Sequence, residues 1–190
     1  MSKTGIQQLG IRRNGDLWQI RVWAPMAKNV LCRFYQKDME IALKPQQYGY
    51  WYAETDLLTA GDLYWISVDG NELPDPISLS QPEGVHGPSK VVDLTFSWTD
   101  NDYRPPALSD FIIYELHVGT FTSSHDFDGV IKKIPYLKDL GITAIEIMPV
   151  AQFPGERNWG YDGVFPFAVQ HSYGCLLYTS DAADEGLGVD

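Results

Sequence analysis

Short stretches of alternating apolar and polar residues run through the first hundred positions. Residues 18–22, Trp-Gln-Ile-Arg-Val, show the pattern most clearly, and a period of two is typical of a strand with one buried face. An Asp-Gly pair at residues 69–70 favours a tight hairpin turn. Strands at this spacing, with no helical pattern between them, predict an antiparallel β-sandwich. The expected strands are residues 17–23, 29–35, 39–43, 48–53 and 63–68.

Prolines interrupt the chain after these strands. They stand at positions 74, 76, 82 and 88, and each removes a backbone N–H group that a helix or a central strand would need. Residues 73–90 are therefore expected to form an ordered but irregular connector.

From residue 110 the pattern changes to that of an α/β domain. Residues 111–118 are a dense apolar run of strand length, residues 129–140 have a helical period, and residues 143–148 form a second apolar strand. Strand, helix and strand within about 40 residues predict a βαβ unit with parallel strands.

Signals at both ends of the helical segment support it, and one residue inside conflicts with it. Asp128 is the expected N-cap and Gly141 the expected C-terminal stop. Pro135 removes one helical hydrogen bond, so we expect a kink there.

The chain of 190 residues is short for the domain that this unit opens. A closed eightfold α/β barrel takes roughly 250 residues, so we expect either a truncated piece or a small α/β module. The last sixteen residues, CLLYTSDAADEGLGVD, leave the strand–helix rhythm, and the string CLLYTSDAADE within them resembles one reading frame of a sequencing-library adaptor. The expected domains are residues 1–104, residues 105–174 and a non-native tail at 175–190.

Charge and cysteine content narrow the classes of function. Acidic residues outnumber basic ones by 25 to 14, a formal net charge of −11, which argues against nucleic acid as a partner. No apolar run suits a membrane span, and the first sixteen residues lack the apolar core of a secretion signal. Cys32 and Cys175 form neither a metal-binding spacing nor a disulfide framework. We therefore expect a cytoplasmic protein without a metal or a cofactor.

Two places carry candidate chemistry. Glu115 and His117 share a face of the first apolar strand, and Glu146 on the second strand can point into the same space. These three residues could form an acid–base cluster, but a hydrogen-bonded polar network inside a barrel is favoured, because buried ionisable groups must be paired.

The second place is the segment that follows residues 143–148, where α/β barrels carry their substrate-binding loops. Trp159 and Tyr161 stand there beside Asn158 and Asp162, and the glycine at 160 allows a tight turn. Rings cover the apolar face of a sugar, while an amide or a carboxylate binds its hydroxyl groups. A carbohydrate-binding loop and an aromatic structural loop fit these residues equally well.

Several motifs resemble the α-amylase superfamily, glycoside hydrolase family 13. They are IYELHVGTF at residues 113–121, the run YLKDLGITAIEIMPV at 136–150 and NWGYD at 158–162. The segments at 74–89 and 151–174 resemble in particular the trehalohydrolase branch of that superfamily. The resemblance extends from about residue 11 to residue 174.

The resemblance implies an immunoglobulin-like (E-set) β-sandwich of the starch-binding type, followed by the truncated start of a (β/α)8 TIM barrel. It implies a retaining glycosidase that cleaves the α-1,4 bond next to the terminal trehalose of malto-oligosyltrehalose and releases trehalose. The implied pathway partner is a malto-oligosyltrehalose synthase. The alternatives are an α-glucan-binding sandwich module and a fragment of a glycogen branching or debranching enzyme.

The resemblance also bears on the site residues. The three essential carboxylates of the superfamily lie on the fourth, fifth and seventh barrel strands, so no catalytic residue is expected in this chain. Tyr161 matches the tyrosine that stacks under the sugar at the cleavage subsite. Asn158, Trp159 and Asp162 are expected to shape the same pocket.

Overall fold

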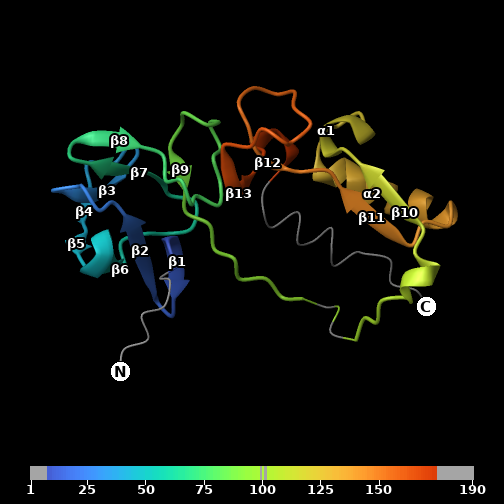
Figure 1. The fold of residues 1–190 in the computed structure, drawn as a ribbon, viewed down its shortest axis with the longest axis horizontal. Helices are drawn as coiled ribbons and strands as arrows, with labels where there is room; N and C mark the ends of the chain where they lie inside the picture. Colours follow the sequence, from blue (N-terminus) through green and yellow to red (C-terminus); the bar gives the residue numbers. More distant parts are fainter. Residues whose placement is uncertain (1–7, 99, 101, 175–190) are drawn as a thin grey trace. The chain divides into compact units, whose positions relative to one another are not determined.

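The computed structural model describes residues 8–98, 100 and 102–174 (Figure 1). The chain divides into two compact units, Met1–Asp93 and Leu94–Asp190. The boundary expected near residue 104 falls inside the second unit, and the domain ranges stay predictions. The expected adaptor-derived tail at 175–190, with Cys175, lies outside the described residues.

The first unit consists of two antiparallel sheets (Figure 1). The first sheet has the strand order β1 (Gly10–Asn14), β2 (Leu17–Trp23), β6 (Tyr50–Thr55) and β5 (Lys44–Pro45). The second has the order β4 (Glu40–Ala42), β3 (Val30–Phe34), β7 (Leu63–Val68) and β8 (Asn71–Leu73), and β9 (Ser89–Lys90) also pairs with β7. Both sheets contribute side chains to one core, which includes Trp18, Ile20, Trp51, Val30, Cys32 and Ile66.

The antiparallel strands expected from the alternating pattern are confirmed, and the bounds of three of the five differ from the expected ones by one or two residues. The β7–β8 hairpin turns at Asp69 and Gly70, which both have positive φ, +51° and +88°. Strand β6 begins at Tyr50 instead of residue 48, because a 3-10 helix, η1 (Gln47–Gly49), precedes it. The alternating pattern could not show this turn, in which Tyr48 has a φ of +62°.

The proline-rich connector is irregular, as predicted, and a buried carboxyl group holds it to the second sheet. Asp75, 3% exposed, accepts hydrogen bonds from the Tyr64 hydroxyl at 2.8 Å and from the Ile77 N–H at 3.0 Å. Its own N–H donates to Ser89 Oγ at 2.9 Å. Burial raises the pKa of Asp75, and burial also raises the pKa of Tyr64.

The second unit contains the predicted parallel βαβ unit. Strand β10 (Ile113–Leu116) pairs in parallel with β11 (Ala144–Ile147), and α2 (Phe127–Asp139) connects them. A second pair, β12 (Ala151–Gln152) and β13 (Phe165–Val169), is antiparallel. The remaining elements are η2 (Leu108–Asp110), α1 (Val118–Phe121) and η3 (His171–Tyr173).

Two sequence predictions about this unit were wrong. The N-cap of α2 is Asp126, whose carboxylate accepts a hydrogen bond from the Gly129 N–H at 2.8 Å, so the expected cap Asp128 lies inside the first turn. The first strand is shorter than residues 111–118, because the chain turns into α1 at Val118. The helix stays continuous across Pro135, and Gly141 follows it with a φ of +88°, as expected of a C-terminal stop.

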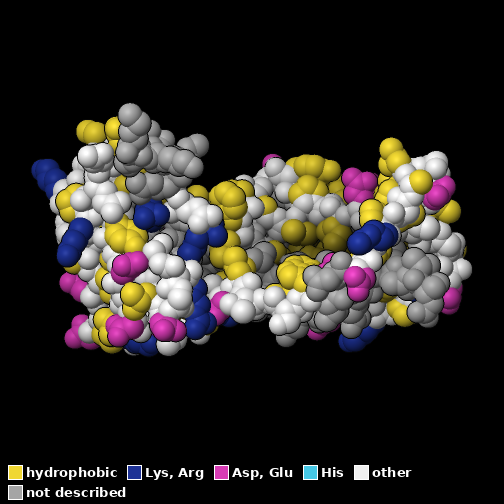
Figure 2. All heavy atoms as spheres, turned by 90° about the horizontal axis from the view of Figure 1, so that it is seen from below, with side chains coloured by type: hydrophobic (Ala, Val, Ile, Leu, Met, Phe, Trp, Pro, Cys, Tyr) yellow, Lys and Arg dark blue, Asp and Glu magenta, His cyan; other side chains and the backbone are white. Residues whose placement is uncertain are grey.

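The core of the second unit lies between the parallel strands, α2 and the β12–β13 pair. Its fully buried members include Leu116, Val130, Leu137, Phe153 and Tyr173. Other large apolar side chains stay exposed, among them Ile112, Ile113, Ile147 and Phe167. Patches of apolar side chains among charged ones are visible on the surface drawn in Figure 2. Within the described residues, every helix is too short or too polar to cross a membrane.

Candidate functional site

The segment between β12 and β13 forms a loop whose ends are held by its flanking strands. The N–H of Val164 donates to the carbonyl of Gln152 at 2.8 Å and closes the loop. Gly160 is buried and has a φ of +92°, a backbone conformation that side chains other than glycine rarely adopt. The loop therefore has a defined path, although it contains no regular structure.

Asn158 organises the part of the loop that carries the candidate residues. Its side-chain oxygen accepts a hydrogen bond from the Gly160 N–H at 2.8 Å, and its amide nitrogen donates to the Asp162 carboxylate at 3.4 Å. Asn158 and Asp162 therefore bind each other across the turn, and Gly160 lies between them.

Trp159 and Tyr161 point outward from the same turn. Their exposed fractions are 73% and 70%, far more than loop-anchoring aromatic residues would keep. All four residues predicted for the site, Asn158, Trp159, Tyr161 and Asp162, thus lie within one short turn. The geometry favours two accessible rings beside an amide and a carboxylate over an aromatic structural loop.

His117 lies beside this turn, although it is 41 residues away in sequence. Its Nε2 is 2.8 Å from the carbonyl oxygen of Asn158 and 3.2 Å from the hydroxyl of Tyr173. The Tyr173 ring packs edge-on against the imidazole, and burial raises the pKa of Tyr173. Sequence reasoning placed His117 in a polar cluster and missed its contact with the loop, because only the fold brings the two segments together.

The cluster of Glu115, His117 and Glu146 does not form among the described residues. Glu115 lies directly opposite Glu146 in the β10–β11 pairing, so the expectation that they face the same space agrees with the register. Both carboxylates are exposed, however, and His117 instead contacts Asn158, Tyr173 and Thr120.

Two buried glutamines hold the base of the loop, and the sequence offered no signal for them. The side-chain amide of Gln152 donates to Gln170 Oε1 at 2.7 Å. Gln170 in turn donates to the carbonyl of Gly155, in the same loop, at 3.1 Å. Because glutamine is usually exposed, its type alone does not predict a buried pair.

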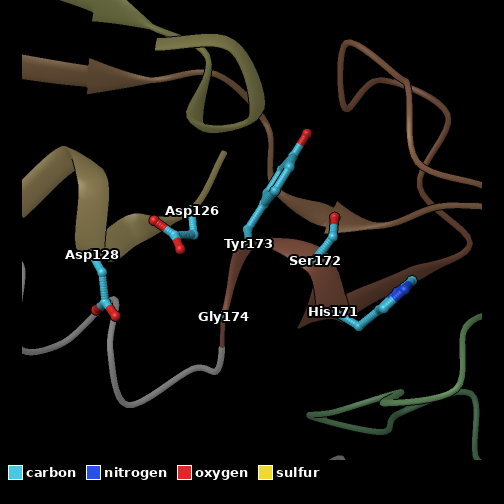
Figure 3. Close-up of a pocket in the computed structure, with 6 residues that line it drawn as sticks. All are labelled: Asp126, Asp128, His171, Ser172, Tyr173 and Gly174. Carbon is cyan, nitrogen blue, oxygen red and sulfur yellow. The ribbon is translucent and has the colours of Figure 1, made fainter. Parts of the chain in front are cut away.

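A pocket of about 180 Å³ lies at the start of α2, lined by Asp126, Asp128, His171, Ser172, Tyr173 and Gly174. Figure 3 shows that the side chains of His171 and Tyr173 point away from the two aspartates. The Ser124 hydroxyl and the Gly129 N–H hold the pKa of Asp126 below its usual range, consistent with its capping role. These groups do not converge on one point as a catalytic set would.

Metal binding finds no support in the described part of the chain, where no group of three or more His, Cys, Asp or Glu side chains could hold an ion. The loop offers two exposed rings, an amide and a carboxylate as groups that a ligand can contact.

Comparison with known proteins finds relatives of the chain among trehalohydrolases and α-amylases. Residues 92–181 match the family described as "Alpha amylase, catalytic domain". The malto-oligosyltrehalose trehalohydrolase of Saccharolobus solfataricus is 46% identical over 87% of this chain, and that of Deinococcus radiodurans is 47% identical over 68%. The chain spans 29% and 22% of the length of these two relatives.

A solved structure agrees with this relationship. The crystal structure of a Salmonella typhimurium protein assigned to the α-amylases superimposes with a TM-score of 0.86 at 35% identity. The match covers 95% of this chain and 31% of that one. The chain is therefore a homologue of the malto-oligosyltrehalose trehalohydrolases, enzymes of the α-amylase family.

Proposed function

We propose that the chain is part of a retaining α-glycosidase that cleaves the α-1,4 bond next to the terminal trehalose of malto-oligosyltrehalose and releases trehalose. The observation that carries this proposal is the turn at residues 158–162, which presents two exposed rings beside an amide and a carboxylate. Homology with trehalohydrolases supplies the class of substrate.

In this proposal Tyr161 stacks against the sugar at the cleavage subsite. Its 70% exposed ring can reach an apolar sugar face without any change in the core. Trp159 offers a second ring, and Asn158 and Asp162 bind sugar hydroxyl groups with the hydrogen-bonding capacity that remains beyond their mutual contact at 3.4 Å. The turn thus supplies substrate contacts but no proton transfer.

The reaction itself needs a carboxylate nucleophile and a second carboxyl group as acid and base. We propose that these groups and the third essential carboxylate lie on later strands of a (β/α)8 TIM barrel, of which β10 and β11 are the first two. The two antiparallel sheets of the first unit are proposed to be an immunoglobulin-like (E-set) domain of the starch-binding type. On this basis the 190-residue chain has no glycosidase activity by itself.

The proposed setting is cytoplasmic, with malto-oligosyltrehalose synthase as the pathway partner that supplies the substrate. Neither a metal nor a cofactor enters the proposed hydrolysis, because the carboxyl groups carry out both of its steps.

The test compares the chain with a chimera in which the rest of the Saccharolobus solfataricus enzyme follows residue 174. Both are incubated with malto-oligosyltrehalose and with an uncapped malto-oligosaccharide of equal length. We expect free trehalose only from the chimera and only with the capped substrate. Trehalose from the chain above a boiled control would contradict the missing carboxylates, and a folded chimera that prefers the uncapped substrate would contradict the trehalohydrolase assignment.

A further inference from the structure

We propose that His117 is a positioning residue that fixes the turn at residues 158–162, and through it the rings of Trp159 and Tyr161. The positioning role stands on the geometry of the chain alone. Only its consequence for sugar binding rests on the proposed function.

The hydrogen bonds of the imidazole define which nitrogen carries the proton. A carbonyl oxygen can only accept, so Nε2 must donate its proton to Asn158 O, 2.8 Å away. Nδ1 is then free to accept from the Thr120 hydroxyl at 3.3 Å. With the proton on Nε2 the ring satisfies both contacts, and the same N–H also lies 3.2 Å from the Tyr173 hydroxyl oxygen, which can accept as well.

The ring is also held sterically. Tyr173, 2% exposed, packs edge-on against it with ring centroids 5.8 Å apart, and Phe153 packs against Tyr173 in turn. Gly119 packs closely on both rings, since a Cβ atom there would come within 2.8 Å of the Tyr173 ring and within 3.1 Å of the imidazole. The donor of His117 therefore belongs to the rigid core of the second unit.

The turn has few other links to that core. The hydrogen bonds from Asn158 to Gly160 and to Asp162 both stay inside the turn. Among the described residues, the bond from His117 is the hydrogen bond that connects residues 158–162 to the rest of the unit. Without this bond the turn keeps its internal shape, but its position then depends on the close packing of Gly160 on Pro149 and on the loop ends that flank it.

A turn that moves as a unit presents its two rings in many positions. Fixing the two rings in one position when a ligand binds lowers the affinity, because conformational entropy is lost. A turn that is already fixed avoids this loss. We therefore expect His117 to affect both the opening of the turn and the affinity for a sugar that the rings contact.

The chain contains a natural reporter of turn opening. Arg157 is exposed and directly precedes Asn158, so trypsin can cut between them when the turn opens. His117→Phe keeps an aromatic ring against Tyr173 but removes the donor, whereas His117→Gln keeps an N–H donor close to the position of Nε2. His125→Asn is the matched control, since His125 contacts Gly119 O and asparagine tolerates its φ of +61°.

We expect His117→Phe to speed the cut at Arg157 about 3- to 10-fold. This factor corresponds to the net free energy that one hydrogen bond contributes. His117→Gln should stay within about twofold of the wild type, and His125→Asn should not change the rate. Mass spectrometry identifies the fragment that begins at Asn158, and cuts at Lys132 and Lys133 in α2 serve as the internal reference. An unchanged Arg157 rate in His117→Phe would overturn the proposal, as would equal acceleration at the α2 sites, because His117 would then act on overall stability.

Titration of the same variants with maltotriose separates this proposal from the proposed function. If the turn loosens in His117→Phe but the wild type does not bind maltotriose, the positioning role stands and the sugar-binding role of the turn fails. If the wild type binds and His117→Phe neither loosens the turn nor weakens binding, the positioning role fails and the sugar-binding role stands.

Discussion

A Cβ atom on Gly160 would lie 1.8 Å from the carbonyl oxygen of Pro149. Such a distance is impossible without movement of the backbone, so the turn at 158–162 packs directly on the chain that leaves β11. Gly155 in the same loop also has a positive φ, +77°, but a Cβ atom there would meet nothing within 4 Å. A substitution at Gly155 therefore measures the free-energy cost of the backbone conformation alone. A substitution at Gly160 adds the cost of the contact with Pro149.

Gly160→Ala is expected to destabilise the second unit more than Gly155→Ala does. The Gly155 variant should lose roughly 1–2 kcal/mol from its left-handed backbone conformation, and the Gly160 variant should lose about 1–3 kcal/mol more from overpacking. Urea unfolding followed by tryptophan fluorescence and by hydrogen exchange in residues 158–164 gives both values. Equal losses would show that the contact with Pro149 is relieved at no cost.

The two aspartates at the start of α2 should respond differently to replacement by alanine. Asp126→Ala removes the cap of the Gly129 N–H and should cost about 1 kcal/mol of helix stability. Asp128→Ala removes only a favourable charge in the first turn and should cost less, on the order of 0.3 kcal/mol. Hydrogen exchange of the α2 amides measures both effects, and a larger loss at Asp128 would contradict the observed cap.

Asp75 should make the stability of the first unit depend on pH. Its raised pKa means that the folded state binds the proton more tightly than the unfolded chain does. The stabilisation that Asp75 contributes is therefore complete below the pKa of an ordinary aspartate, about 3.9. It is lost as the pH rises through the raised pKa of the folded state. The free energy of unfolding should fall over that window, and Asp75→Asn should remove the fall.

The measurement is the difference in unfolding free energy between wild type and Asp75→Asn at several pH values. Glu54 and Asp62 have lowered pKa values and act in the opposite direction, but they contribute equally to both proteins and cancel. Asparagine can still accept from the Ile77 N–H, so the comparison isolates the charge. A difference in unfolding free energy that stays constant with pH would show that Asp75 has the same pKa in the folded and the unfolded state.

Tyr161→Ala in the chimera should lower kcat/KM about tenfold to several hundredfold. This corresponds to roughly 1.4–3 kcal/mol of lost transition-state stabilisation, because the ring holds the sugar as positive charge develops. Tyr161→Phe should cost much less if stacking dominates. Tyr136→Ala, which removes an exposed tyrosine on α2, is the control, and equal kinetics of the two alanine variants would remove Tyr161 from the site.

The sequence predicted the features that depend on neighbouring residues. The alternating pattern of residues 17–23 is local, and β2 has the predicted bounds. The parallel pairing of β10 with β11 followed from the length of the segment between them. The four residues of the turn are neighbours in the chain, so the sequence alone places them together, and their role in a site stays a prediction.

The choice of the helix cap and several long-range contacts were missed. Asp126 and Asp128 are both suitable caps, and only the bond to the Gly129 N–H decides between them. The link from His117 to Asn158 and the buried pair of Gln152 and Gln170 each join residues far apart in sequence. No local pattern contains that information.

Residues 158–162 differ in what holds them in place. Asn158, Gly160 and Asp162 hold the turn, whereas Trp159 and Tyr161 are turned outward. In the proposed function, a mutation at an outward position changes the rings that meet the sugar while the hydrogen bonds inside the turn stay intact. On that proposal, selection can adjust ligand preference at Trp159 and Tyr161 without compensating changes in the core.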